Sequence, residues 1–388
     1  MNIKEKINRK EVIQVLSDMV SINSVNSALM PDAPGEAKVA EYIAQFFTSL
    51  NIKHHYQEVY PGRSNIIGTI PGKDPKKHLV FESHMDVVST KGMTIPPFQP
   101  KIEGNRMYGR GTCDTKSSMA GMLCAIKAIL ETGEQPSCTV TIVGAVDEEH
   151  LYRGVVKLVD ANMSFTAGVV GEPTELNIVR AHKGCVRWRI IVQGRAAHTS
   201  KPQLGVNAIV KMGNVIKAIE ERLQPQYKAK THPLVGNPTL TISMIQGGTQ
   251  VNFVPDECSI TLDRRVIPGE DKDTVWKEFD SILDFVRKQD PDLKVHMEEP
   301  YAADWAMETE EHENIVQVGF KSAQDTLKSL RITGVPYGTD ASKLVRSGIP
   351  CIVLGPGSID QAHTADEWVD LDQVVLCSEI YARIMMSY

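Results

Sequence analysis

The segment from about residue 184 to residue 298 constrains the fold most, because its predicted elements follow the order β-α-β-β-α-β. Strand patterns are CVRWRIIVQG, TLTISMIQGG, CSITLDRRV and LKVHMEE, and helical patterns cover 205–223 and 272–288. This order is that of a ferredoxin-like α+β unit. We therefore predict a small, separate domain over residues 184–298.

The chain on either side of this segment alternates helices with strands. Helical spacing of apolar residues covers 10–22, 35–50 and 117–132, and strand-like runs cover 64–70, 78–84 and 138–146. After residue 300 we expect a helix near 312–329, a buried strand at IPCIVLGPG and a terminal helix from about 371. Such alternation favours an α/β fold with a mixed, mainly parallel sheet flanked by helices. We predict that residues 1–183 and 299–388 form this larger domain, into which 184–298 is inserted.

The stretch LVFESHMDVVST, residues 79–90, ends an apolar run with a histidine and an aspartate two positions apart. Residues i and i+2 of a strand point the same way, so His84 and Asp86 share a face. One interpretation is a hydrogen-bonded pair that finishes a strand. The other is a metal-ligating imidazole whose second nitrogen is held by a carboxylate. The pair alone does not decide between them.

Four further clusters stand where strands of the larger domain should end: GRGTCDTKSS with Asp114, VDEEH with Glu148 and Glu149, VVGEPTE with Glu172, and GPGSIDQAHTADE with His363. Ligands of open α/β sheets collect beyond the carboxyl ends of the strands, so we expect these loops to converge. Asp114 could instead be a helix N-cap, and Glu172 and His363 could be exposed loop residues. The Glu148–Glu149 pair is harder to explain in this way, because carboxylates after the apolar run VTIVGAV are costly to bury unless protonated, paired or metal-bound.

Together, two histidines and three carboxylates make five protein ligands, the number that two zinc ions need if one carboxylate bridges them. Zinc accepts imidazole nitrogen and carboxylate oxygen, and a catalytic site leaves a position for water. A further carboxylate remains for proton transfer. The pattern indicates metal-assisted hydrolysis by two ions about 3.5–4 Å apart.

Seven motifs, in order from residue 83 to residue 363, carry a resemblance to a known family: SHMDVV, GRGTCDTK, DEE, GEPT, GRAAHTSKPQLGVNAI, GGTQVNFVP and GPGSIDQAH. The chain resembles the dizinc deacylase and exopeptidase family that includes acetylornithine deacetylase, succinyl-diaminopimelate desuccinylase, aminoacylase and glutamate carboxypeptidase. The resemblance implies a zinc-exopeptidase-like catalytic domain made of 1–183 and 299–388. It also implies that 184–298 is a lid or dimerisation domain, and hence that the protein is a homodimer. One departure is Ser117, where many relatives have glycine.

The resemblance implies a metal-site role for each matching residue. One zinc ion is held by His84, Asp114 and Glu172, and the other by Asp114, Glu149 and His363, so that Asp114 is the bridge. Glu148 is the general base, which must not itself be consumed as a ligand. Asp86 orients His84.

Further residues are implied to contact the substrate. His198 in GRAAHTSKP matches a histidine that stabilises the oxyanion, often in the active site of the partner subunit. Without the motif, His198 would be taken as a cap of the helix expected to begin near Gly205. Asn252 and Arg265 match positions that grip the substrate carboxylate, for which the planar fork of arginine is suited.

Two details of this substrate set need comment. Arg264 and Arg265 are adjacent and point to opposite faces of a strand, and the spacing from Asp263 favours Arg265 as the ligand. Gly338 and Thr339 in PYGTDAS match a further loop that lines the pocket.

Within the family, the segments GEPTELNIVRAHKG, VLGPGSIDQAHTADE and GTCD look most like acetylornithine deacetylase. The expected reaction is removal of the acyl group from an N-acyl amino acid, first of all N-acetylornithine in arginine biosynthesis, with two Zn2+ or alternatively Co2+. Succinyl-diaminopimelate desuccinylase and a small metallo-exopeptidase, either carboxypeptidase or dipeptidase, are the alternatives, since they differ only in pocket walls. A non-catalytic binding protein is the remote alternative.

Composition limits the partners and the location. The net charge of −6 and the absence of a long basic run argue against a nucleic-acid or membrane-surface partner. The seven scattered cysteines, with no C-x-x-C pair, are typical of reduced thiols. The first residues lack the apolar stretch of a signal peptide, and the apolar segment 119–130 is too short to cross a bilayer. We expect a cytoplasmic enzyme that acts on a small molecule.

Overall fold

The computed structural model describes residues 3–30, 32–327 and 329–388, and the chain divides into two compact units. Unit 1 comprises residues 1–180, 309–333 and 339–388, and unit 2 comprises 181–308 and 334–338. Strands β8 (Ile178–His182) and β15 (Ile332–Val335) each run from unit 1 into unit 2. The segment predicted as a separate domain, 184–298, falls within unit 2.

Unit 1 contains a mixed sheet in the order β1-β2-β6-β3-β7-β16-β8. Its further strands are β1 (Lys53–Tyr60), β2 (Arg63–Ile70), β3 (Asp74–His84), β6 (Cys138–Ala145), β7 (Ala167–Val170) and β16 (Cys351–Val353). The central strands β6, β3, β7 and β16 are parallel, while β1, β2 and β8 pair antiparallel. The prediction of a mixed sheet flanked by helices is confirmed, with parallel pairing confined to the four central strands. A small sheet, β17-β5-β4, adds β4 (Lys101–Glu103), β5 (Arg106–Tyr108) and β17 (Trp368–Asp370).

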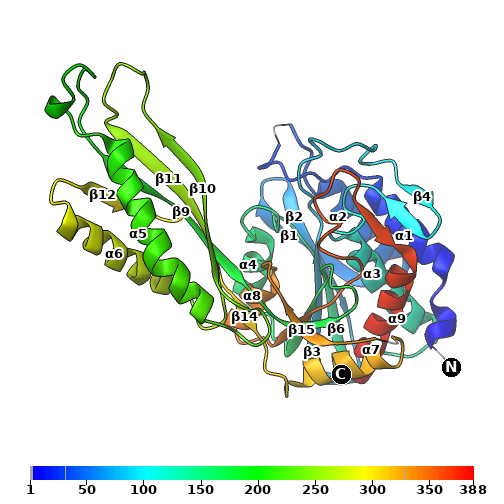
Figure 1. The fold of residues 1–388 in the computed structure, drawn as a ribbon. Coiled ribbons are helices and arrows are strands. Elements are labelled where there is room, and N and C mark those ends of the chain that lie inside the picture. Colours follow the sequence, from blue (N-terminus) through cyan, green and yellow to red (C-terminus); the bar gives the residue numbers. More distant parts are fainter. Residues whose placement is uncertain (1–2, 31, 328) are drawn as a thin grey trace. The chain divides into compact units, whose positions relative to one another are not determined.

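Helices cover both faces of the unit 1 sheet (Figure 1). One layer contains η1 (Ile3–Lys6), α1 (Arg9–Val20), α2 (Ala37–Ser49), α3 (Lys116–Glu131), α7 (Asn314–Gln324) and α9 (Leu371–Ser387). The other contains α4 (Arg153–Asp160) and α8 (Ala341–Arg346). The helix predicted near 312–329 is α7, which ends earlier, and Lys328 lies outside the described residues.

Alternation along β3 sends its side chains to the two layers. Phe81 packs edge-on against Tyr381 of α9, with ring centroids 5.5 Å apart, and belongs to the main apolar core. Glu82 points to the opposite face of the strand. It is also fully buried, beside Asp340 at the start of α8. His84 ends the strand on this same face.

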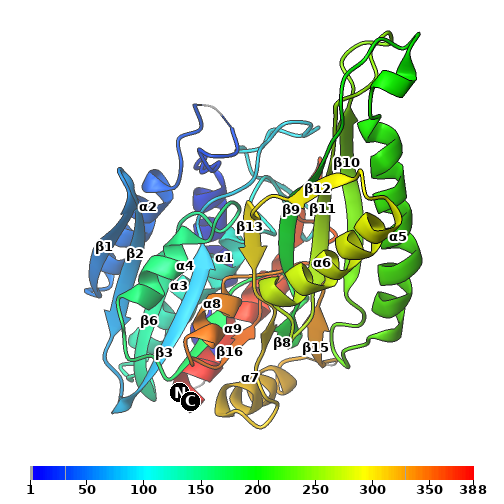
Figure 2. The ribbon, with the colours of Figure 1, turned by 90° about the vertical axis from the view of Figure 1, so that its left-hand side faces the viewer.

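Unit 2 contains the predicted β-α-β-β-α-β order, visible around α5 and α6 in Figure 2. Its elements are β9 (Gly184–Gln193), η2 (Pro202–Leu204), α5 (Ala208–Ala229), β10 (Thr239–Gly247), β11 (Glu257–Val266), α6 (Lys272–Gln289), β12 (Lys294–Met297), β13 (Ala302–Asp304) and β14 (Met307–Glu308). The antiparallel sheet runs β10-β11-β9-β12, with β13 also on β9. Trp188 of β9 is buried against Phe279 of α6, at a centroid distance of 4.7 Å. The helices thus cover one face of this sheet.

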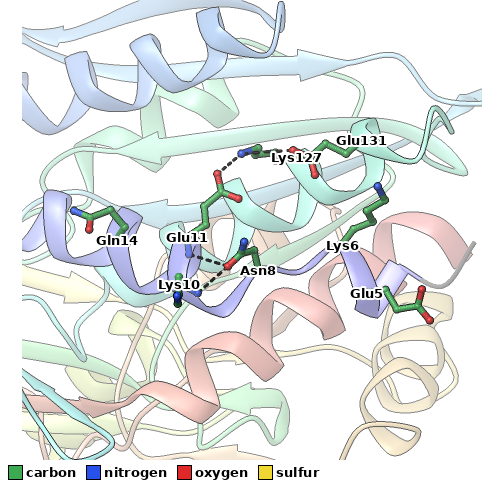
Figure 3. Close-up of a pocket in the computed structure, with 8 residues that line it drawn as sticks. All are labelled: Glu5, Lys6, Asn8, Lys10, Glu11, Gln14, Lys127 and Glu131. Carbon is green, nitrogen blue, oxygen red and sulfur yellow. Dashed lines mark hydrogen bonds and ion pairs between the residues drawn. The ribbon is translucent and has the colours of Figure 1, made fainter.

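A surface hollow of about 700 Å³ lies among η1, α1 and α3 (Figure 3). Its lining is charged and polar, and Lys127 pairs there with both Glu11 and Glu131. It contains none of the predicted site residues. Among the described helices, none combines the length and the apolar character that a membrane span requires.

Candidate dimetal site

The carboxylate of Asp114 lies between two histidines. Its Oδ1 is 3.0 Å from Nε2 of His84, and its Oδ2 is 3.1 Å from Nε2 of His363. The Asp114 side chain is buried in the turn that precedes α3. One carboxylate that turns its two oxygens toward two imidazoles has the arrangement of a ligand that bridges two ions.

Each histidine also faces a glutamate. His84 Nε2 lies 3.7 Å from Oε1 of Glu172, and His363 Nε2 lies 3.1 Å from Oε1 of Glu149. The ligand atoms of His84, Asp114 and Glu149 all lie within 4.8 Å of one another. The structure therefore brings the five predicted ligands together. A second group whose ligand atoms lie within 4.8 Å of one another consists of His84, Glu148 and Glu172, so the two groups share His84.

Parallel pairing of the central strands explains this convergence. His84 is the last residue of β3, the Glu148–Glu149 pair follows β6, and Glu172 follows β7. Strands β6, β3 and β7 are adjacent and parallel, so their carboxyl ends meet at one edge of the sheet. His363 reaches this edge from the loop after β16, with a left-handed backbone (φ +58°).

Asp86 supports the site through both its carboxylate and its main chain. The carboxylate accepts hydrogen bonds from the main-chain N–H groups of Glu148 and Glu149, both at 3.1 Å, and from Asn26 Nδ2 at 2.8 Å. The Nδ1 atom of His84 is 2.9 Å from the Asp86 main-chain oxygen and 3.6 Å from its carboxylate. A proton on Nδ1 donated to that oxygen leaves the Nε2 lone pair facing Asp114.

A buried network behind the Glu148–Glu149 turn was not foreseen from the sequence. Asp147 accepts hydrogen bonds from Asn26 Nδ2 at 3.0 Å and from the Tyr60 hydroxyl at 2.8 Å, and Arg63 Nη2 lies 3.4 Å away. Arg63 also donates through Nε to Glu36 at 2.7 Å. The position of Asp147 directly before Glu148 was the one available signal.

The site contains more carboxyl groups than imidazoles. Burial raises the pKa of Glu148 well above its usual value, and repulsion from Glu149 adds to this effect. Burial lowers the pKa of His363, but Asp114 and Glu149 outweigh it and raise that pKa to about 11. At His84 the nearby carboxylates, of which Glu172 has the largest effect, likewise outweigh burial and raise the pKa well above its usual value. Buried carboxylates in excess of imidazoles are stabilised by cations, and the oxygen and nitrogen donors suit divalent metals.

The implied substrate residues His198 and Asn252 lie near each other in unit 2. His198 is exposed, its Nδ1 is 2.8 Å from the Ser200 hydroxyl, and the Thr199 N–H donates to the Asn252 carbonyl at 3.1 Å. The alternative interpretation of His198 as a helix cap is wrong, because the Asn207 side chain caps α5.

Arg265 lies toward the opposite end of β11 from Asn252. Its Nε donates to Asp263 at 2.9 Å, and its side chain is partly exposed, whereas Arg264 is fully buried and donates to Glu270 at 3.0 Å. Between the start of β11 and Arg265 the strand extends about 26 Å, at roughly 3.3 Å per residue. Within unit 2, Arg265 is therefore not brought together with His198 and Asn252.

Gly338 and Thr339 lie on either side of the division between the units. A Cβ atom on Gly338 would come 2.8 Å from Oδ2 of Asp304, so a side chain is not tolerated there without a shift. Thr339 is buried, and its hydroxyl accepts the Ala341 N–H at 3.2 Å.

Comparisons with known proteins agree with this site. The family described as peptidase family M20/M25/M40 matches residues 80–387. The chain is 29% identical to an acetylornithine deacetylase of Vibrio campbellii, over 97% of this chain and 98% of the relative. It is 27% identical to a probable succinyl-diaminopimelate desuccinylase of Staphylococcus aureus, over 98% of each chain.

Solved structures share the fold. Aminopeptidase PepT from Bacillus cereus superposes with a TM-score of 0.80 at 22% identity, covering 98% of this chain and 99% of that one. An M20 family metallo-carboxypeptidase from Sulfolobus solfataricus gives 0.77 at 18% identity, covering 97% and 98%. With the matched family model and the clustered metal-ligating residues, the conclusion is that the chain belongs to peptidase family M20/M25/M40 and is a metal-dependent hydrolase.

Proposed function

We propose that this protein is a dizinc amidohydrolase that removes the acyl group from an N-acyl amino acid, with N-acetylornithine as the first candidate substrate. The observation that carries the proposal is the placement of Asp114 between His84 and His363, each of which faces a further glutamate. Imidazole and carboxylate donors suit Zn2+, and Co2+ accepts the same donors.

The bound ions would polarise the amide carbonyl and activate a water. Glu148 is the general base: it takes the proton of the attacking water and returns it to the nitrogen of the leaving amine, so that the products are a carboxylate and a free amine. Burial and Glu149 raise its pKa above the usual value of a carboxyl, which favours a group that accepts a proton and later returns it. The Glu148 carboxylate also lies within 4.8 Å of possible ligand atoms of His84 and Glu172. An experiment on Glu148 must therefore distinguish a general base from a metal ligand.

The candidate substrates are taken from two kinds of relative, a deacetylase and a desuccinylase. N-Acetylornithine is favoured by the motifs GEPTELNIVRAHKG and GPGSIDQAHTADE, and the acetylornithine deacetylase relative supports it. N-Succinyl-diaminopimelate is the alternative, supported by the desuccinylase relative, followed by short peptides.

A substrate panel tests these alternatives. The purified protein is loaded with Zn2+ or Co2+, and amine release is measured on N-acetylornithine, N-succinyl-diaminopimelate and unmodified di- and tripeptides, with and without a chelator. We expect the highest kcat/KM on N-acetylornithine, loss of activity with chelator and recovery when metal is restored. A higher kcat/KM on the succinyl compound or on peptides reassigns the substrate, and no amine release from any of them refutes the proposal.

We also propose a homodimer in which His198 and Asn252 serve the active site of the partner subunit, while Arg265 serves its own. In support, His198 and Asn252 lie at the end of β11 opposite to Arg265, too far for one small substrate to contact all three within unit 2. His198 is assigned to stabilise the oxyanion. Arg265 is assigned to bind the substrate carboxylate, with Gly338 and Thr339 lining the pocket.

Exposed apolar side chains of unit 2 support this dimer. Strand β10 is the edge of its sheet, and Met244 and Ile245 on it are 54% and 57% exposed. Val251 and Phe253, on either side of Asn252, are 98% and 43% exposed and line a groove of about 540 Å³. An exposed apolar edge strand is a template for pairing with a second chain.

Hybrid dimers test the shared site. A His198→Ala chain keeps its own Glu148, and a Glu148→Ala chain keeps its own His198. If His198 acts across the dimer, mixing and refolding the two inactive variants restores about a quarter of the wild-type activity, because half of the random dimers are hybrids with one intact site. Recovery of no activity, with a dimer confirmed by light scattering, contradicts action across the dimer.

We propose that this enzyme acts in the cytoplasm. All seven cysteines are buried and unpaired, which suits a reducing compartment.

A further inference from the structure

We propose that Glu367 is a positioning residue of the metal site, which joins the turn carrying Asp114 to the loop carrying His363. The inference rests on the proposed dimetal function. It concerns the part of that site where the bridging ligand and one histidine must be held together.

On one side, the Glu367 carboxylate organises the Asp114 turn. Its Oε1 accepts three main-chain N–H groups, from Gly111 at 3.0 Å, Cys113 at 2.9 Å and Asp114 at 3.1 Å. The turn precedes α3, whose N-cap Thr115 makes no side-chain capping bond. One buried oxygen thus fixes the main chain of the turn up to the bridging ligand itself.

On the other side, Glu367 belongs to the same loop as His363, four residues later. Its Oε2 accepts Arg110 Nη1 at 2.7 Å, and Arg110 Nη2 donates to the main-chain oxygen of Thr364, next to His363, at 3.4 Å. The Gly109 N–H donates to the Glu367 main-chain oxygen at 3.0 Å. The segment 109–114 and the loop 363–367 are therefore tied together at several points.

The burial of the Glu367–Arg110 ion pair points to a role other than stabilising the fold. Glu367 is fully buried and Arg110 is nearly so. A buried ion pair gains little net stability, because desolvation of both charges opposes their attraction. Partners that orient metal ligands, in contrast, affect metal affinity or activity by about 10–100-fold when removed. We assign Glu367 to this second role, acting through Asp114 and His363.

The chain offers a matched control in Glu270. It is also a buried carboxylate, and it accepts Arg264 Nη2 and the Ile267 N–H, both at 3.0 Å, but it belongs to unit 2, whereas the five proposed metal ligands belong to unit 1. Glu270→Gln removes the same charge from a similar environment. Any general cost of losing a buried carboxylate is therefore measured separately.

The test compares metal affinities. Stepwise Zn2+ binding is measured by competition with a chromophoric chelator for wild type, Glu367→Gln and Glu270→Gln, and the visible spectrum of the Co2+ form reports ligand geometry. We expect Glu367→Gln to weaken binding of one ion, the one assigned to Glu149 and His363, by about 10–100-fold and to alter its Co2+ spectrum. Glu270→Gln should bind both ions as wild type does. Glu367→Asp keeps the charge and should recover part of the affinity. If Glu367→Gln does not fold, Glu367→Asp is compared with wild type in its place.

If the Glu367 variants have the same metal affinities and Co2+ spectra as Glu270→Gln, the inference is overturned and Glu367 is a structural residue. This holds even if the unfolding temperature of the Glu367 variants is lowered. Wild-type protein that binds fewer than two ions would instead overturn the proposed dimetal function. The two failures are thus distinguishable.

Discussion

The Nδ1 atom of His84 lies closer to the main-chain oxygen of Asp86, at 2.9 Å, than to the Asp86 carboxylate, at 3.6 Å. The carboxylate instead holds the main-chain N–H groups of Glu148 and Glu149. Asp86 therefore connects the proposed metal ligand on β3 with the turn after β6, and these two contacts are made by different atoms of Asp86.

This division predicts the effect of Asp86→Asn. The variant keeps the main-chain oxygen that orients His84, but its amide can no longer accept hydrogen bonds at both atoms, so the Glu148–Glu149 turn loosens. We expect kcat to fall by about 10–100-fold with a smaller loss of metal affinity. The check is kcat measured beside the Zn2+ dissociation constant, and an affinity loss larger than the kcat loss contradicts the assignment.

The second prediction is that metal affinity rises with pH. In the metal-free site the carboxylates raise the pKa of His363 to about 11, so its imidazole is protonated at pH 7, and they raise the pKa of His84 well above its usual value. Metal binding must displace these protons. For each protonated ligand, the apparent affinity therefore falls by about tenfold for every unit by which the pH is lowered. Calorimetric titration in buffers of different ionisation enthalpy should show net proton release at pH 7.5. An affinity that does not change between pH 6.5 and pH 8.5 contradicts this expectation.

The third prediction concerns the buried pair of Glu82 and Asp340. Burial raises the pKa of Asp340 to about 7, against the opposing effect of Lys343, and raises that of Glu82 well above its usual value. The folded chain thus keeps a proton that the unfolded chain releases near its usual pKa of 3.8. The free energy of unfolding therefore falls as pH rises from about 4 to about 7, by at most about 1.4 kcal/mol per pH unit for one proton.

Asp340→Asn removes this proton linkage. In denaturant unfolding of the metal-free protein at pH 5, 6, 7 and 8, the stability of the variant relative to wild type should increase with pH. The comparison reports on the Glu82–Asp340 pair, because Asp340 itself raises the pKa of Glu82, whereas more distant titrating groups are common to both proteins. A difference that stays constant over this range would mean that Asp340 titrates normally.

Periodicity predicted most of the fold, and its failures have physical causes. The strand β1 (Lys53–Tyr60) was missed because it is a largely exposed edge strand with the polar sequence KHHYQEVY. The helix predicted to end at 223 continues to Ala229 through Pro225, because Leu223 and Tyr227 on either side of the proline are both buried in the core of unit 2. Tertiary packing overrides the local signal there.

Motifs predicted the residues that converge at the site, but not what holds them. His84, Glu149 and Glu172 follow from the carboxyl ends of the adjacent parallel strands β3, β6 and β7, so their clustering could be predicted from the strand ends. Asp114, in the turn before α3, does not follow a strand of this sheet, so its place in the cluster rested on the motif. Glu367 accepts main-chain N–H groups, and Asn26 and Asp147 contact side chains of distant segments. Such contacts leave no periodic pattern in the sequence. The assignment of His198 and Asn252 to a partner subunit stays a prediction.

The central claim is that Glu148 transfers protons while five other residues hold two ions. It is tested most directly by the metal content of Glu148→Gln, determined by mass spectrometry after gel filtration and set beside its turnover and beside the metal content of His84→Ala and His363→Ala. The account predicts two ions per chain in Glu148→Gln with kcat lowered by about 10²–10⁴-fold, and loss of metal in both histidine variants. Loss of metal from Glu148→Gln to the same extent as from the histidine variants would contradict it and make Glu148 a ligand.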